Sequence, residues 1–210
     1  MWQLAGHSRA TTLLQQSLKN GQLSHAYLLV GPAHVGKFTL ARNLAQAVNC
    51  TSAEPPCQEC TSCRRIAASK HSDIYIVDLI SVEKKEIGIR QIAEMQNAAH
   101  LPPFEGKYKV FIFDRAEMLS NEAANSLLKT LEEPPPNILI ILLTAKESAL
   151  LPTIASRWHS NSSSCFIFIM WVSPSFPKGF YCWDFPAVPV PSADPWQFPS
   201  PQLVHPVQIP

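Results

Sequence analysis

The stretch AYLLVGPAHVGK, residues 26–37, decides the fold of this 210-residue chain. Its five apolar residues from Ala26 to Val30 predict a short buried strand, which the Gly31-Pro32 pair ends. Helical spacing of apolar residues returns over Phe38 to Val48. A strand, a glycine-containing turn and the start of a helix therefore follow one another directly, which is typical of a phosphate-binding loop.

The turn itself, Gly31 to Lys37, fits the G-x4-G-K part of the Walker A pattern. Glycine lets main-chain amides point at phosphate oxygens, the helix start adds its positive end, and Lys37 would reach the terminal phosphates. The pattern continues with a Ser or Thr that binds Mg²⁺, but Phe38 stands here, and Thr39 lies about 100° further round a helix. We expect ATP or ADP to bind through Gly31, Gly36, Lys37 and Thr39, with weakened Mg²⁺ binding. A chance strand-glycine-helix turn is the alternative.

Strand and helix patterns alternate along residues 1–158. The expected strands are Ala26–Val30, Ile74–Leu79, Lys109–Phe113 and Ile138–Leu143. The expected helices are His7–Lys19, Phe38–Val48, Ile89–Ala99, Asn121–Glu132 and a short one at Leu150–Ala155. The strands are continuously apolar, as buried parallel strands are. The pattern predicts an α/β fold in three layers, with a parallel sheet covered by helices on both faces.

An aspartate, Asp114, ends the apolar strand Phe111-Ile112-Phe113 and matches the Walker B position that supports magnesium. ATPases of this class place a glutamate next, to orient the attacking water, but Arg115 stands here. Glu117 lies two residues further on and is not expected to substitute without rearrangement. The sequence therefore predicts slow or absent hydrolysis. The alternative is an aspartate that only caps the following turn.

Four cysteines lie close together in the sequence, at Cys50, Cys57, Cys60 and Cys63. In a chain with no secretory signal such a cluster indicates metal rather than disulfides. Four thiolates bind Zn²⁺ tetrahedrally with no open position, which predicts a structural zinc module over about residues 50–63 that ties together an otherwise coreless loop. Reduced thiols or an iron–sulfur cluster are the alternatives, and His71 is a spare candidate ligand.

Composition excludes several function classes. The formal net charge is +1, so the chain lacks the basic balance of a protein that grips DNA alone. Apolar residues make up 46% of the chain, enough for a packed core. The N-terminus has no apolar segment of signal-peptide type, and the longest apolar run, Phe166 to Val172, is too short to span a bilayer. We expect a soluble, cytoplasmic protein without membrane contact.

Residues 159–210 differ in composition from the preceding part. They hold ten of the nineteen prolines but only three charged residues, Lys178, Asp184 and Asp194. Prolines break up strands and helices, and the segment has no sustained period. Two hypotheses stay open: a non-native tail produced by a frameshift or misjoined coding end, and a Pro-rich extension that packs on the core or on a partner, or is disordered.

Several segments together resemble the clamp-loader ATPases of bacterial DNA polymerase III, which belong to the AAA+ class of P-loop NTPases. These segments are Ser24–Pro32, the four-cysteine insert, Asn125–Pro135 and Leu151–Arg157. The resemblance implies the AAA+ fold with a zinc-binding insert. It also implies gamma/tau and delta subunits, a sliding clamp and primed DNA as partners, the DNA through the complex. The family's helical lid and C-terminal oligomerisation domain are expected to be missing from residues 1–210.

The resemblance also implies roles for two further residues. Thr144 matches the sensor-1 position, which probes the terminal phosphate of the nucleotide. Arg157 matches an arginine that acts in trans on ATP bound by a neighbouring subunit, with a solvated surface charge as the alternative. Phe38 and Arg115 are similar to the eroded sites of the delta-prime type of subunit.

Three other interpretations stay open. They are an active ATPase of the gamma/tau type, a zinc-stabilised interaction module, and a truncated fragment. The resemblance implies a component of the polymerase holoenzyme that is not itself the polymerase, and whether the chain hydrolyses ATP is left open.

Overall fold

The computed structural model describes residues 2, 8–78, 86–145, 150 and 166–170. Its helices are α1 Ser8–Lys19, α2 Lys37–Val48, α3 Thr61–Ala67, α4 Ile89–Ala99 and α5 Asn121–Glu132, with a short 3-10 helix, η1, at Ala116–Met118. Its strands are β1 Ala26–Val30, β2 Ile74–Val77, β3 Lys109–Phe113, β4 Ile138–Thr144 and β5 Phe166–Met170.

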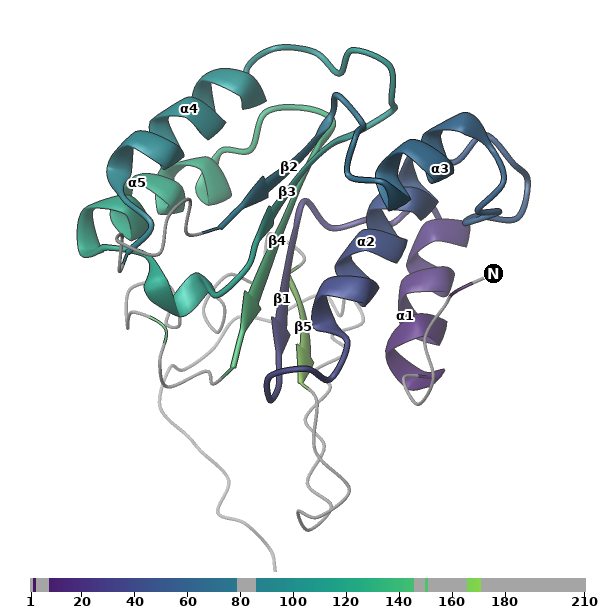
Figure 1. Ribbon diagram of the computed structural model, residues 1–210, viewed down its shortest axis with the longest axis horizontal. Coiled ribbons are helices and arrows are strands. Elements are labelled where there is room, and N and C mark those ends of the chain that lie inside the picture. Colours follow the sequence, from purple (N-terminus) through teal and green to yellow (C-terminus); the bar gives the residue numbers. More distant parts are fainter. Residues whose placement is uncertain (1, 3–7, 79–85, 146–149, 151–165, 171–210) are drawn as a thin grey trace, which may run out of the picture.

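The five strands form one parallel sheet in the order β2-β3-β4-β1-β5 (Figure 1). The register pairs Val30 with Thr144 and Phe113 with Leu142. The carboxyl ends of β1, β3 and β4 therefore meet at the same edge of the sheet. In open parallel sheets ligands bind at this edge.

Helices cover both faces of the sheet, so the predicted three-layer α/β fold is confirmed. On one face, α1, α2 and α3 pack through Leu14, Leu44 and Ile66, each at most 1% exposed. On the other face, α4 and α5 pack through Ile92 and Leu127, both 0% exposed (Figure 1). The amphipathic spacing that predicts these helices is the spacing that covers the sheet.

Two short elements were not predicted from the sequence. Helix α3 lies in the cysteine segment, and its Ile66 is 1% exposed against the core. The expectation of a coreless loop there is therefore wrong, because a short helix with one apolar anchor suffices to join the segment to the sheet. The helix η1 follows β3, where Arg115 adopts a positive φ of 60°. Of the expected helix Leu150–Ala155 only Leu150 is described, and it is buried.

Strand β5 was also not predicted. It pairs in parallel with β1 along its whole length, from Ala26 with Phe166 to Val30 with Met170. Its five residues are continuously apolar, which suits parallel pairing without any alternation. The hypotheses about the origin of residues 159–210 stay predictions.

A buried carboxylate fastens the connection between α4 and β3. Asp73, 0% exposed, accepts backbone hydrogen bonds from Phe104, Glu105 and Gly106 at 2.7, 2.8 and 2.7 Å. Burial raises the pKa of Asp73, but these three N–H groups outweigh it and hold the pKa below its ordinary value. The turn before β3 is thereby tied to the start of β2.

Candidate nucleotide site and candidate metal centre

The loop between β1 and α2 has the geometry of an anion-binding helix start. Helix α2 begins at Lys37, and the residue before it, Gly36, has a left-handed conformation with φ 92° and ψ 16°. Glycine adopts this conformation without a Cβ penalty. Because Gly36 has no side chain to cap the helix, the first-turn amides are left to water or to a ligand.

Lys37 lies over its own loop. Its Nζ donates hydrogen bonds to Gly31 O and Pro32 O, both at 2.6 Å. Burial lowers the pKa of Lys37, while the charges of Glu117 and then Asp114 act in the opposite direction. Lys37 is therefore within electrostatic reach of both carboxylates, and phosphate binding requires it to exchange carbonyl acceptors for phosphate oxygens.

Thr144 and Asp114 lie at the same edge of the sheet as the loop. Gly31 N donates to Thr144 O at 3.1 Å, and Thr144 is 1% exposed at the end of β4. Asp114 follows β3, and its N donates to Val77 O at 3.1 Å. The structure thus brings together the Walker A loop, the Walker B aspartate and the sensor-1 position predicted from the sequence.

The side chains at the two positions that depart from the ATPase pattern both have partners outside the phosphate loop. Phe38 packs, half-buried, against the apolar cluster under α1 and α2. Arg115 donates from Nη2 to Asp78 Oδ1 at 2.8 Å, along the sheet edge towards β2. Thr39 is half-buried one position further along α2.

Glu117, for which the sequence predicts no direct role, lies in η1. Its charge acts on Lys37 more strongly than that of Asp114 does. Its Oε2 is shielded from solvent and has no hydrogen-bond partner among the described residues. The sequence signal that could have indicated this residue is its position three residues after Asp114. A positive φ at Arg115 turns the chain there, and Glu117 comes within electrostatic reach of Lys37.

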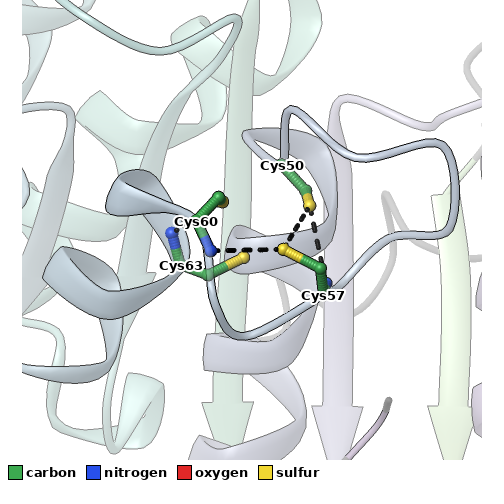
Figure 2. Close-up of side chains that lie close together, drawn as sticks. All are labelled: Cys50, Cys57, Cys60 and Cys63. Carbon is green, nitrogen blue, oxygen red and sulfur yellow. Dashed lines mark hydrogen bonds between the residues drawn. The ribbon is translucent and has the colours of Figure 1, made fainter.

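The four cysteines form a compact cluster where the segment after α2 meets the start of α3 (Figure 2). All are free thiols, and their sulfur atoms lie within 4.8 Å of one another. Tetrahedral zinc at about 2.3 Å from each sulfur needs sulfurs roughly 3.8 Å apart. The predicted ligands are therefore close enough to bind one ion with small adjustments.

Backbone amides point at the sulfur atoms of this cluster. Cys57 N donates to Cys50 Sγ at 3.5 Å, while Cys60 N donates to Cys57 Sγ and Cys63 N to Cys60 Sγ, both at 3.4 Å (Figure 2). Burial raises the pKa of Cys60, but amide and thiol hydrogen bonds outweigh it and bring the pKa to about 6. Thiolate is the form that binds metal. Four sulfur ligands with amide support fit structural zinc.

Two further candidates lie apart from these sites. The ring of His71 is 0% exposed, and its Nδ1 lies 3.5 Å from Glu105 Oε1 rather than in the cysteine cluster. Arg157 lies outside the described residues, so its predicted role in trans stays a prediction. None of the helices in the described part of the chain has the length and apolar character needed to span a bilayer.

The arrangement of sheet, loop and strand-end residues defines a P-loop ATPase fold of the AAA+ class. A solved structure from Thermotoga maritima, titled as a DNA polymerase III gamma subunit-related protein, has the same fold with a TM-score of 0.54 and 24% identity. The match covers 77% of this chain and 46% of that one.

Residues 6–161 match the protein family described as "DNA polymerase III, delta subunit". The chain therefore belongs to this family of DNA polymerase III subunits.

Two curated relatives carry related names. The gamma/tau subunit of Mycobacterium tuberculosis is 35% identical over 159 residues, and the tau subunit of Bacillus subtilis is 38% identical over 156 residues. These matches cover 75% and 73% of this chain but only 27% of each relative. The chain thus spans about a quarter of the length of these two relatives.

Proposed function

We propose that this chain is a clamp-loader subunit of the delta-prime type, which binds nucleotide but hydrolyses it slowly or not at all. The observation that carries the proposal is the orientation of Arg115 and Phe38. The residue that follows the Walker B aspartate pairs with Asp78, and the residue that follows the P-loop lysine packs against the core. An ATPase of this class uses a carboxylate and a hydroxyl at these positions.

In this role the chain works through a complex. Its partners are gamma/tau and delta subunits, and together they place a sliding clamp on primed DNA in the cytoplasm. Zinc held by the four cysteines is structural: it fastens α3 to the end of α2, where Gln46 Nε2 donates to Cys63 O at 2.9 Å. The four ligands leave no open position for catalysis.

The catalytic contribution is made in trans. Arg157 matches an arginine of the family that acts in trans. In this role it contacts ATP bound by a neighbouring gamma/tau subunit and stabilises the charge that develops on the transferred phosphoryl group. The test mixes this chain with gamma/tau and delta subunits, clamp and primed DNA. We expect Arg157→Ala to lower ATP turnover at least about tenfold, whereas the exposed-residue control Arg90→Ala keeps it. Equal turnover with Arg157→Ala contradicts this role.

An active gamma/tau-type ATPase is the second candidate. Its support is the set of names carried by the curated relatives, together with the retained Lys37, Asp114 and Thr144 at one sheet edge. Phosphate release by the purified chain separates the two candidates. We expect the wild type to turn over ATP no faster than Lys37→Ala, and brisk turnover that Lys37→Ala abolishes would establish the active ATPase instead. A chain that neither binds nucleotide nor affects its partners would fit the remaining interpretations, a zinc-stabilised interaction module or a truncated fragment.

A further inference from the structure

We propose that Glu117 is the second acidic residue of the nucleotide site, where its carboxylate accepts hydrogen bonds from water on the nucleotide-bound Mg²⁺. This inference rests on the proposed function, because it requires a nucleotide at the loop formed by residues 31–37. It offsets part of what the site loses at Phe38 and Arg115.

The backbone holds Glu117 in one place. Arg115, with φ 60°, turns the chain at the end of β3, and η1 follows at once. Ile87, 0% exposed, clamps the far side of this turn: its N donates to Met118 O at 2.7 Å, and Ser120 N donates to its O at 3.1 Å. A carboxylate on such a braced turn is positioned before any ligand arrives, which is what an acceptor for a metal-bound water requires.

The carboxylate lies within electrostatic reach of the P-loop lysine. Of the two acidic groups that act on Lys37, Glu117 acts more strongly than Asp114. Arg115, the cation next to them in sequence, is already hydrogen-bonded to Asp78. The Arg115–Asp78 pair is neutral as a whole, so the charges that remain at this edge are one lysine and two carboxylates. Their net charge is negative and repels phosphate unless a divalent cation is bound with it.

The unpaired oxygen indicates what the site accepts. Glu117 Oε2 is excluded from solvent and has no hydrogen-bond donor among the described residues. Lys37 Nζ donates its hydrogen bonds to Gly31 O and Pro32 O instead. A shielded carboxylate oxygen needs a donor. Mg²⁺ keeps several of its waters when it binds nucleotide phosphates, and those waters are strong donors.

The experiment measures ADP affinity of the full chain by calorimetric titration, once with excess Mg²⁺ and once with EDTA. Glu117→Gln is compared with the wild type and with Glu122→Gln, a matched change at an exposed position on α5. With Mg²⁺ we expect Glu117→Gln to bind ADP about tenfold more weakly, the loss usual for a residue that supports a metal through its ligands. In EDTA we expect it to bind more tightly than the wild type, because one repelling charge is gone. Glu122→Gln should match the wild type in both conditions.

The outcomes are distinguishable. Unchanged affinity in both conditions overturns the inference and leaves the proposed function standing. Higher affinity in both conditions also overturns it, since Glu117 would then only hold Lys37 away from phosphate. A wild type that binds no ADP in either condition overturns both. Glu117→Asp keeps the charge, so its affinity in EDTA should stay at the wild-type value, and thermal unfolding of each variant confirms that it is folded.

Discussion

The guanidinium of Arg115 lies 2.8 Å from the carboxylate of Asp78, and this pair joins the ends of β3 and β2. In the sheet order β2-β3-β4-β1-β5, the P-loop follows β1 on the other side of β4. The side chain that replaces the water-orienting glutamate is therefore directed towards β2, away from the phosphate loop. In the function proposed here, this orientation is the reason that the site binds phosphate without hydrolysing ATP.

Removing this pair should leave nucleotide binding intact. We expect Arg115→Ala to change ADP affinity by less than about twofold, and the Arg115–Asp78 coupling in a double-mutant cycle to be about 0.2–1 kcal/mol, falling with added salt, as for other exposed pairs. Both side chains are close to half exposed, at 49% and 45%. Calorimetric titration and urea unfolding measure the two quantities. A loss of ADP binding in Arg115→Ala would place the guanidinium in the nucleotide site.

Restoring the missing hydroxyl should strengthen the Mg²⁺-dependent part of ADP binding. We expect Phe38→Thr to raise ADP affinity about tenfold with Mg²⁺ and to leave it unchanged in EDTA, because a P-loop hydroxyl ligates the metal. The loss of a half-buried ring should cost about 1–2 kcal/mol of unfolding free energy. Phe38→Leu is the matched control, since it keeps apolar packing without the hydroxyl. The account fails here if Thr and Leu variants bind alike in both conditions.

The purified chain should contain one zinc ion for each molecule. We expect elemental analysis to give this ratio, and chelator treatment to lower the melting temperature and expose α3, because the metal joins the cysteine segment to α2. Cys60→Ser should reduce both zinc content and melting temperature. Ser62→Ala, in the same turn of α3, is the control and should change neither. A metal-free chain with the wild-type melting temperature would contradict a structural zinc.

The Asp73 carboxylate should make stability depend on pH. Its folded-state pKa lies below the ordinary value, so its contribution is fully present above about pH 4 and is lost as pH falls further, through the folded pKa. We expect Asp73→Asn to cost about 2 kcal/mol of unfolding free energy at pH 7, with the gap from the wild type narrowing below pH 4. Urea unfolding across this range measures the gap. The exposed change Glu94→Gln should show no such gap, and a pH-independent cost for Asp73→Asn would contradict the linkage.

Much of the fold follows from the sequence because the signals are local. The continuous apolar runs of β1, β3 and β4 and the amphipathic spacing of α5 each predict their own element, and a parallel sheet brings strand ends to one edge. That rule places the P-loop, Asp114 and Thr144 together without any structure. The cysteine spacing is also a local signal, since each Cys-x2-Cys pair fits within one turn, and it therefore predicts the cluster.

The remaining features depend on contacts that no local pattern carries. The turn that brings Glu117 towards Lys37 rests on a positive φ at Arg115, a residue with no particular preference for it, and on a bridge from Ile87 across the chain. Helix α3 has only seven residues and one apolar anchor, Ile66, which is too little for a periodic signal. Strand β5 acquires its role only by pairing with β1.

The measurement that tests the central claim most directly is titration of the full chain with ADP in the presence of Mg²⁺, for the wild type, Lys37→Ala and the exposed-lysine control Lys129→Ala. The account predicts saturable one-to-one binding by the wild type and by Lys129→Ala, and loss of at least about tenfold in affinity for Lys37→Ala. Binding that is equally strong in Lys37→Ala, or no binding in the wild type, would contradict the claim that the loop from Gly31 to Lys37 holds nucleotide phosphate.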